Sequence, residues 1–337
     1  MPVRVGFDHE TIAHRGLTAK ETLKFAAGHG FDGVQFLTAE SIDAGHDHGK
    51  LAGFRQEADG RGLYLEVGIP SPNPARHSRL GGREVSISEL IVHIGQSLEA
   101  VAALGCSHAR AFVGDRHDRF RNDIDWATQR QATLAVLELL KPRLEALGIK
   151  LAIETHADLT VVELMTFLEH LGPEVVGVTF DTANVLMRFD EPVAAAERLA
   201  KWVISTHVKD AVLAFTPRGL CWQARPVGSG IVPLPDVLAP LIHANPDLNL
   251  SIELHPRTYD LPIYDRNWLG YFPDLTPAEL ASIVRIAMTC ESRYVEGSLT
   301  RPEKVEKTPW EDRDLDWLAS SLGYLRMVVQ GLLRVEG

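Results

Sequence analysis

Eight short runs of apolar, β-branched and aromatic residues recur along the chain, and a segment with helical periodicity follows each of them. The runs predicted to be strands are Val3–Phe7, Gly33–Phe36, Leu63–Ile69, Ala109–Val113, Lys150–Ile153, Val175–Phe180, Val203–His207 and Leu248–Ile252. Segments such as Glu89–Leu104 and Thr128–Leu147 carry apolar residues at helical spacing, as expected of helices that cover a parallel sheet. Eight β-then-α units predict an α/β fold, a closed (β/α)8 barrel of the TIM type.

The length of the chain fits one elaborated barrel or two smaller domains, because 337 residues with 45% apolar content can bury a large core. The main alternative fold, a doubly wound open sheet, favours a glycine-rich turn after its first strand, and here that turn reads DHETIAHRG. We therefore predict a single domain over residues 1–337. Its core spans about 3–292, its C-terminal extension spans about 293–337, and a final helix covers about Leu315–Leu333.

Two segments depart from the plain repeat. The loop Pro70–Gly82 is a candidate lid. The stretch HPRTYDLPIYDRNWLGYFP, which begins at His255, is too aromatic for a simple linker. It can cover the barrel mouth, pack against a neighbouring subunit, or close this molecule's own core.

The overall charge argues against an extended nucleic-acid surface, because a formal charge of -11 opposes the clustering of Lys and Arg that phosphates require. The three cysteines, Cys106, Cys221 and Cys290, form no CxxC pair, so neither a disulfide framework nor a thiolate zinc site is indicated. The N-terminus lacks a signal-peptide pattern, and no run approaches the ~18 apolar residues of a membrane helix. We expect an untargeted cytoplasmic protein that binds neither nucleic acid nor membrane.

The last four predicted strands each end on a side chain that can bind a hard or borderline cation. The strand ends IETH, TFDTAN, STHVKD and SIELH supply Glu154, Asp181, His207 and Glu253. A single acid at a strand end is more often a helix cap or a loop salt bridge. Four of them would need four separate explanations, whereas the carboxyl ends of barrel strands converge on one site. Buried carboxylates also require a partner or a metal.

The composition of this set indicates the kind of metal. Three carboxylates and one imidazole suit Mn2+, Mg2+ or Co2+ and do not exclude Zn2+; we predict Mn2+. Such an ion can hold two neighbouring oxygens of a substrate and stabilise the enediolate formed when the carbon beside a ketone loses a proton or a carboxylate.

The four strand ends, in this order and spacing, together with HVKD and the turn Val227–Gly230, resemble the xylose isomerase-like superfamily of sugar isomerases and epimerases over residues 3 to 290. The resemblance implies the barrel, a metal bound by the four residues above, and proton transfer at a keto-sugar with Glu154 and Glu253 as acid and base. The segments IETHADLT, DTAN, HVKD and NWLGYFP are also similar to a 3-oxo-isoapionate decarboxylase-like subgroup, which acts on 3-oxo sugar acids.

Two positions depart from the keto-sugar epimerases of that superfamily. These enzymes place a histidine three residues after the strand-six aspartate, where this chain has Asn184. They place a further glutamate six residues beyond the strand-five ligand, where this chain has Thr160. Because those side chains help hold and protonate an epimerase's sugar, plain epimerisation is weakened. Asn184 remains a candidate substrate contact.

Neighbours of the four ligands are further candidates for catalysis. His156, two residues beyond Glu154, is predicted to donate or accept a proton, or else to orient Glu154. Lys209 can pair with a substrate carboxylate or polarise its carbonyl, or else brace the loop by pairing with Asp210.

Candidates for substrate binding lie at other strand ends. Arg257 and His255 can form a fork for a carboxylate, or lie on the rim. Gln35, with Asp8, His9 and Glu66, is a candidate contact at the barrel mouth, and Gly228 and Gly230 are expected to allow a tight turn near the substrate.

Our leading hypothesis is a metal-dependent lyase that decarboxylates a 3-oxo sugar acid through an enediolate. The alternatives are a sugar isomerase or epimerase, a C-glycoside deglycosidase working with a small partner subunit, and a non-catalytic sugar-binding barrel. An abasic-site nuclease of this fold is disfavoured, because VQFL, GIPSP and AFVGD lack its additional histidines. The expected partner is a small carbohydrate, and we expect a homo-oligomer.

Overall fold

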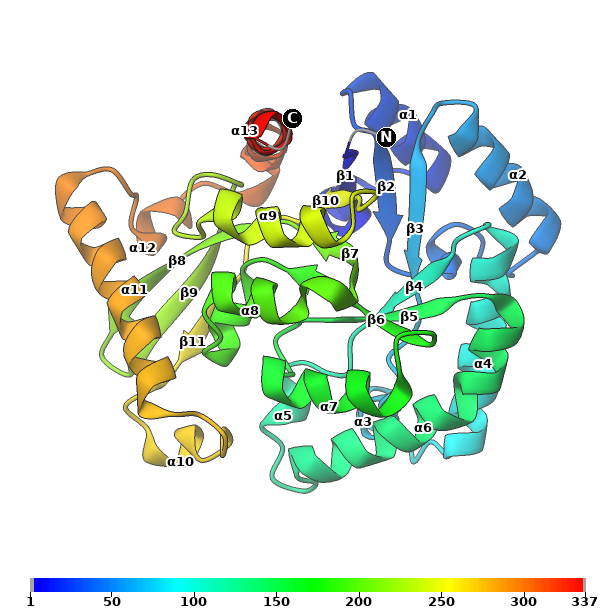
Figure 1. Cartoon of the computed structure of the whole chain (residues 1–337), viewed down its shortest axis with the longest axis horizontal. Helices are drawn as coiled ribbons and strands as arrows, with labels where there is room; N and C mark the ends of the chain where they lie inside the picture. The colour runs from blue at the N-terminus through cyan, green and yellow to red at the C-terminus, as the bar shows by residue number, and fades with distance from the viewer. Residues whose placement is uncertain (1–2, 336–337) are drawn as a thin grey trace.

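Eight parallel strands form the central sheet of the computed structural model, which describes residues 3–335 (Figure 1). They are β1 (Val5–Asp8), β2 (Gly33–Phe36), β3 (Tyr64–Gly68), β4 (His108–Ala111), β5 (Lys150–Glu154), β6 (Val176–Asp181), β7 (Val203–His207) and β10 (Leu250–Ile252). Neighbours follow chain order from β1 to β7, and β10 pairs with β1. All eight predicted strands are confirmed, and almost all of their residues are buried, as their apolar runs require.

The sheet closes into a barrel between β7 and β10. Val208, directly after β7, forms a parallel bridge with Ile252. The N–H of Val208 donates to the carbonyl of Ser251 at 2.7 Å, and its carbonyl accepts from the N–H of Glu253 at 3.2 Å. The predicted single α/β barrel is therefore confirmed, and the seam of the barrel lies at the carboxyl ends of its strands.

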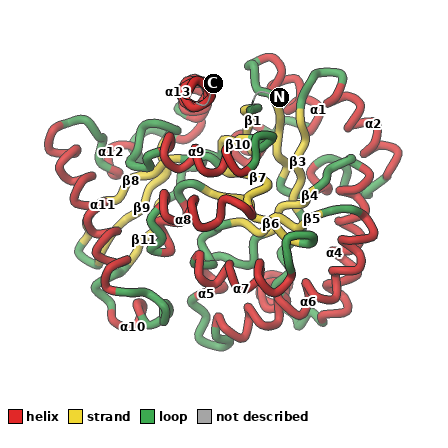
Figure 2. The backbone as a smooth tube through the Cα atoms, in the orientation of Figure 1, coloured by secondary structure: helices red, strands yellow, loops and turns green. Residues whose placement is uncertain are grey.

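Helices surround the sheet on its outer side (Figure 2). Between the barrel strands run α1 (Ala19–Gly28), α2 (His48–Asp59), α3 (Pro74–Gly81), α4 (Ile87–Ala103), α5 (Arg116–Arg119), α6 (Trp126–Leu147), α7 (Val161–Leu171), α8 (Pro192–Leu199) and α9 (Leu234–Ala244), and the 3-10 turns η1 (His9–Arg15), η2 (Ala39–Ser41), η3 (Asn184–Arg188) and η4 (Ala200–Trp202). Capping boxes begin α1, α4 and α7, at Thr18, Ser86 and Thr160. Local sequence therefore sets where these helices start.

A second sheet, not predicted from the sequence, stands beside the barrel (Figure 1). Its antiparallel strands are β8 (Asp210–Thr216), β9 (Gly219–Arg225) and β11 (Thr258–Leu261), in the order β11-β9-β8. Helix α11 (Pro277–Glu296) packs on it, and Tyr294 Oη donates to the carbonyl of Leu213 at 3.1 Å. The segments that leave the barrel after β7 and β10 therefore continue into a rigid sheet.

The two irregular segments both pack against this molecule. The candidate lid contains α3, where Arg76 and Arg79 pair with Asp118. The aromatic stretch after His255 contains α10 (Arg266–Leu269), and the ring centroid of Trp268 lies 5.4 Å from that of Phe120 and 5.8 Å from that of Phe189. Trp268 of this stretch thus helps to close the molecule's own core, while residues 255–259 at its start line the cleft at the carboxyl ends of the barrel strands.

The C-terminal region contains α12 (Pro302–Val305), the 3-10 turn η5 (Trp310–Asp312) and α13 (Asp314–Val335). The predicted final helix is confirmed as α13, which contacts β1, α9 and β10. Helix α11 spans the predicted boundary at about 292, so core and extension share one helix. In the part of the chain that the structure describes, no helix is both long and apolar enough to cross a membrane.

Candidate metal and substrate site

The four predicted ligands meet at the carboxyl end of the barrel. Glu154, Asp181 and His207 are the last residues of β5, β6 and β7, and Glu253 directly follows β10. One donor atom from each lies within 4.8 Å of every other donor atom, close to the spacing around a single ion. The first three side chains are buried, and Glu253 is 16% exposed. The sequence therefore identified the members of one compact cluster.

The orientation of His207 fits a metal ligand. Its Nε2 contacts Gln35 Oε1 and lies 3.3 Å from Asp8 Oδ2, and both of these oxygens only accept, so Nε2 carries the proton. In the neutral ring, Nδ1 then presents its lone pair to Glu154 Oε1 at 3.1 Å and Glu253 Oε2 at 3.0 Å. A lone pair aimed at two carboxylates requires either a second ring proton or a cation between them.

The charges of the cluster also fit a divalent ion. Four carboxylates, those of Asp8, Glu154, Asp181 and Glu253, surround His207 and its neighbours. Two cations, Arg110 and Lys209, pair with this group, which leaves two negative charges on side chains that are almost entirely buried. Since an uncompensated buried charge is costly, a divalent cation is the matching partner for this donor set.

The pKa values of the cluster follow from these contacts. Burial lowers the pKa of His207, but Glu253 and Glu154 outweigh burial and raise it well above its ordinary value. Burial raises the pKa of Glu253, but Lys209 and His207 outweigh burial and hold it well below its ordinary value. Burial also raises the pKa of Asp181, to about 6, against the opposing effect of Lys209. Without a metal, His207 is thus the group that takes up a proton.

Arg110, on β4, is a site residue that the sequence analysis missed. Its Nη1 donates to Glu154 Oε2 at 2.7 Å, while Glu154 Oε1 faces His207. Both oxygens of Glu154 are therefore engaged by protein groups. Burial raises the pKa of Glu154, but His207 and Arg110 outweigh it and lower that pKa, so Glu154 is a weak base here.

Lys209 lies inside the ligand cluster. Its Nζ is 2.8 Å from Asp181 Oδ2 and 2.5 Å from Glu253 Oε2, and it reaches Asn184 Oδ1 at 3.5 Å. The side chain is 1% exposed. The structure thus brings Lys209 and Asn184 together beside the ligands, and the alternative pairing of Lys209 with Asp210 is not the one found.

Asp210 instead explains why HVKD and VGSG occur in the same chain. Its carboxylate accepts from the N–H groups of Gly228, Gly230 and Val232, at 3.2, 2.7 and 2.9 Å. A Cβ at Gly230 would lie 2.2 Å from Asp210 Oδ1, so only glycine fits there. The glycine turn therefore holds Asp210 and fixes the start of β8, and neither glycine is among the residues that line the large cleft.

His156 lies at the edge of the same site. Strand β5 ends at Glu154, and the turn that follows places the His156 ring on Phe112, with 4.7 Å between centroids. His156 Nδ1 lies 2.9 Å from the carbonyl of Gly114, which only accepts, so Nδ1 carries a proton. His156 lines the cleft, which leaves Nε2 as the ring nitrogen free to exchange a proton with a ligand.

The other predicted contacts divide between the cleft and the layer beneath the ligands. His255 and Arg257 line the cleft, whereas Gln35 and Glu66 lie below the ligands, where Gln35 Nε2 donates to Glu66 Oε2 at 2.9 Å. His9 stacks on Phe36 at 5.3 Å. Burial and the Lys209 ammonium hold the pKa of His255 well below its ordinary value, so this ring is neutral.

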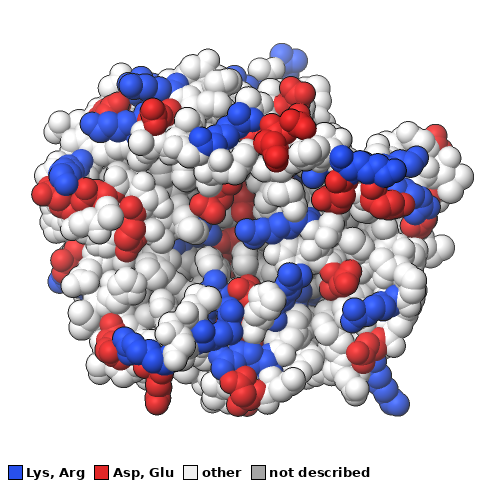
Figure 3. Space-filling view, turned by 180° about the vertical axis from the view of Figure 1, so that it is seen from behind, with Lys and Arg blue, Asp and Glu red and all other residues white. Residues whose placement is uncertain are grey.

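A cleft of about 830 Å³ opens above the ligands. Its lining is acidic at the floor, where Glu154, Glu253 and Asp8 lie, and largely basic and aromatic toward the rim. Figure 3 shows this face, with carboxylates deep in the central hollow and Lys and Arg side chains around it. The rim and wall residues are Arg76, Arg110, Phe112, Arg116, His117, Arg257, Tyr259 and Trp310. The cleft can therefore admit a polar, oxygen-rich ligand to the metal cluster.

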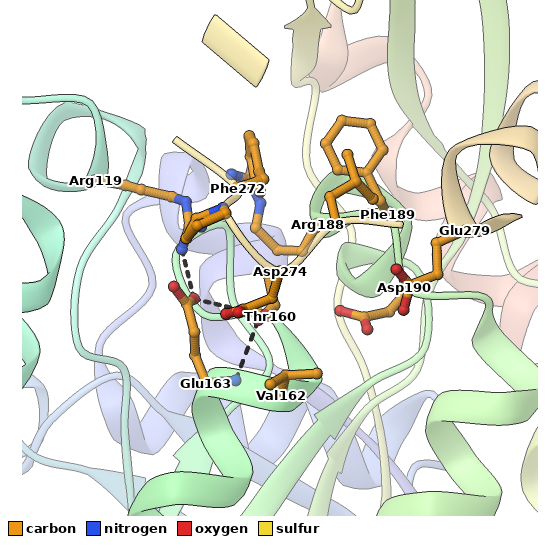
Figure 4. A pocket seen from close by; sticks show the side chains of 12 residues that line it. Arg119, Thr160, Val162, Glu163, Arg188, Phe189, Asp190, Phe272, Asp274 and Glu279 are labelled. Atoms are coloured by element: carbon orange, nitrogen blue, oxygen red, sulfur yellow. Dashed lines mark hydrogen bonds and ion pairs between the residues drawn. The ribbon is translucent and has the colours of Figure 1, made fainter. Parts of the chain in front are cut away.

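A second cavity of about 20 Å³ lies between α7, η3 and the loop before α11, and it admits no more than a water-sized group. Figure 4 shows Arg119 and Arg188 on one side of it and Asp190 and Glu279 on the other. Arg119 Nη1 pairs with Glu163 Oε2 at 2.6 Å. Because of its size, we assign this cavity to packing.

Replacing Asp190 with asparagine is expected to stabilise the protein at pH 8 much more than at pH 5. Burial and the carboxylates of Glu279 and Glu163 raise the pKa of Asp190 to about 7, from an ordinary value of 3.8. The folded protein therefore keeps this proton at a pH where the unfolded chain has lost it. The associated stability is full below about pH 4 and is lost as the pH rises through about 7.

Thermal unfolding at the two pH values measures this effect. The gain in Tm of Asp190→Asn over the wild type should grow with pH, whereas Asp274→Asn, which changes an exposed carboxylate at the same cavity, should show no such trend. Equal gains at pH 5 and pH 8 would contradict the assignment.

The comparisons with known proteins agree with the fold. The family model for the xylose isomerase-like TIM barrel matches residues 23–271. A protein named YihM from Escherichia coli K12, described as uncharacterized, is 32% identical over 95 residues, which span 28% of this chain and 29% of YihM. The similarity to YihM thus covers less than a third of either protein.

Two solved structures share the architecture. A D-psicose 3-epimerase crystallised with D-fructose aligns with a TM-score of 0.61 at 19% identity, over 87% of this chain and 99% of its own. The IolI protein with a bound zinc atom aligns with a TM-score of 0.56 at 17% identity, over 89% of this chain and 100% of IolI. At these identities the likeness concerns the fold. Since the family model spans most of the chain, this protein belongs to the xylose isomerase-like TIM barrel family.

Proposed function

We propose that the protein is a divalent metal-dependent enzyme that acts on a keto-sugar or keto-sugar acid through an enediolate of the substrate, and that it is a lyase that decarboxylates a 3-oxo sugar acid. The observation that carries the proposal is the convergence of Glu154, Asp181, Glu253 and the Nδ1 lone pair of His207 at the floor of a large cleft. The donor set suits Mn2+ as the resident ion.

When bound, a divalent ion would hold two neighbouring substrate oxygens and stabilise the negative charge that develops on them. The chain's own groups supply the remaining parts. In decarboxylation, the bond between the carboxylate carbon and the carbon beside the ketone breaks, CO2 leaves, and the electron pair moves toward the ketone oxygen. Lys209 offers a buried ammonium beside the site for that negative charge. His156, whose Nδ1 already carries a proton, would take up a second proton at Nε2 from solvent and return it to the carbon that lost CO2.

The contacts of Glu154 favour decarboxylation, which needs proton transfer on one face of the substrate, over epimerisation. Inverting one carbon requires a base on one face of the sugar and an acid on the other. Arg110 donates to Glu154 Oε2, and Glu154 Oε1 faces the four-residue cluster beside His207 Nδ1, so neither oxygen is left to serve as a second acid or base. Thr160 caps α7 and Asn184 faces Lys209, so neither position supplies a second acid or base.

A sugar isomerase or epimerase is the second candidate, because the D-psicose 3-epimerase structure shares the barrel along nearly the whole of its length. The two reactions differ in whether carbon is lost. They can therefore be separated by a single panel of substrates.

The test is to incubate Mn2+-loaded protein with 3-oxo sugar acids and with neutral ketoses, and to measure CO2 release together with α-proton exchange in deuterated water. Decarboxylation predicts metal-dependent CO2 release from the acids, abolished by chelation. Rapid exchange on neutral ketoses without CO2 release would assign the protein to isomerisation or epimerisation. Inactivity on both groups would remove the proposed function.

A further inference from the structure

The cleft is larger than a single sugar ring requires. Even if each of the twelve non-hydrogen atoms of a hexose took the ~30 Å³ of a liquid water, the sugar would fill only about 360 Å³. The cleft measures about 830 Å³. More than half of it thus remains open when a monosaccharide occupies the metal end.

Away from the four predicted ligands, the lining of the cleft is largely aromatic and basic. Tyr259 on β11 and Trp310 in η5 line the cleft, and the guanidinium of Arg116 lies 5.1 Å from the centroid of the Tyr259 ring. Of these two aromatic side chains, Trp310 has the larger ring face to offer to a ligand. Its side chain is half-buried.

Trp310 comes from a part of the chain beyond residues 23–271, the range matched by the family model. Ion pairs and hydrogen bonds with η1 hold the segment around Trp310 in place. Arg15 donates to both oxygens of Asp314 at 2.6 Å, and His14 Nε2 lies 3.1 Å from the same carboxylate. Arg15 Nη2 also donates to the carbonyl of Glu311 at 3.3 Å. The residue next to Trp310 is thus tied to the rim of the barrel.

Packing contacts hold the indole itself. The Trp317 ring meets Trp310 edge-on, with 5.6 Å between centroids, and the guanidinium of Arg313 lies 5.6 Å from the Trp310 ring. His14, which also lines the cleft, lies 6.3 Å away in a T-shaped arrangement. An aromatic side chain that is already held in place loses little conformational entropy when a ligand binds, as expected of a preorganised subsite.

We propose that Trp310 forms an outer subsite that binds a second ring of the substrate, joined to the keto-sugar that occupies the metal end. The inference deepens the proposed function: the substrate class is a keto-sugar linked to another ring. An aromatic group and a second sugar both present an apolar face that stacks on indole, and the experiment separates these two sources.

The experiment measures the equilibrium binding of three unreactive glycosides to Mn2+-loaded protein by calorimetry. The probes are methyl β-D-glucopyranoside, phenyl β-D-glucopyranoside and cellobiose. At least one of the two-ring probes should bind about fivefold or more tightly than the methyl glycoside, the ratio expected of one stacked ring. A preference for the phenyl probe identifies an aromatic group, and a preference for cellobiose identifies a second sugar.

Two variants that keep an apolar side chain test the role of Trp310. Trp310→Leu should remove the preference, and Trp310→Phe should retain part of it. Trp268→Phe, a change in the Phe120 cluster outside the cleft lining, should leave it intact. Equal affinities for all three probes in the wild type, or a full preference in Trp310→Leu, would overturn the inference. Because the probes do not react, this outcome is independent of whether keto-sugars are turned over.

Discussion

Glu253→Gln is expected to lower the affinity of the protein for Mn2+ by at least about a hundredfold and to abolish turnover of the keto-sugar substrate, while the fold is retained. Glu253 Oε2 faces His207 Nδ1 at 3.0 Å and Lys209 Nζ at 2.5 Å, so it lies at the centre of the ligand cluster. The substitution preserves shape but removes one negative charge. The amide nitrogen, if turned inward, would also face an ammonium group.

Calorimetric titration with Mn2+ and the metal content of the purified protein measure this effect. Glu10→Gln is the matched control, because Glu10 is a carboxylate that lines the same cleft without belonging to the four-residue group. The control should bind Mn2+ as the wild type does. Unchanged Mn2+ affinity in Glu253→Gln would remove this residue from the ligand set and, with it, the proposed centre.

His156→Ala is expected to lower turnover by about 10²- to 10⁴-fold with little change in metal content, the loss typical of a missing general acid or base. The reason is geometric. The hydrogen bond from Nδ1 to the carbonyl of Gly114 fixes the ring and its tautomer, which leaves Nε2 available at the cleft. The ring is not one of the four metal-binding groups.

The rate per bound metal, measured with the lyase substrate or by proton exchange, distinguishes a role of His156 in proton transfer from a role in holding the metal. His117→Ala, which alters an exposed histidine of the same cleft, should cost little. If His156→Ala instead loses metal while each remaining metal works at the normal rate, His156 acts by supporting Glu154. A lower incorporation of solvent deuterium into the substrate in the variant than in the wild type would support direct proton transfer by His156.

The strands and the clustering of the four side chains were predictable because both depend on local sequence and on one rule of the fold. A buried parallel strand must be apolar along its length, so the run LAIE predicts both strand β5 and an acidic residue, Glu154, at its carboxyl end. The rule that barrel strands present their carboxyl ends to one site then brings Glu154, Asp181, His207 and Glu253 together. No long-range contact had to be known.

Residues whose role depends on tertiary contacts were harder to find. Arg110 lies in the strand HARA, where a guanidinium between two alanines needs a buried carboxylate, and that signal was present but was not used. The hairpin of β8 and β9 places the apolar runs AVLAF and LCW on either side of the turn TPRG, so it too was readable. The pairing of β11 with β9, the packing of Trp310 against Trp317 at the cleft, and the binding of Asp210 by a distant glycine turn had no local signature.

The position of the barrel seam has a consequence for how metal loading and architecture are linked. The single bridge that completes the ring joins Val208 to Ile252, and these residues immediately follow His207 and precede Glu253. An ion shared by those two side chains would therefore span the first and last edges of an otherwise continuous sheet. Metal binding would then stabilise the closure of the barrel between β7 and β10, so the ion would have a structural role as well as a catalytic one.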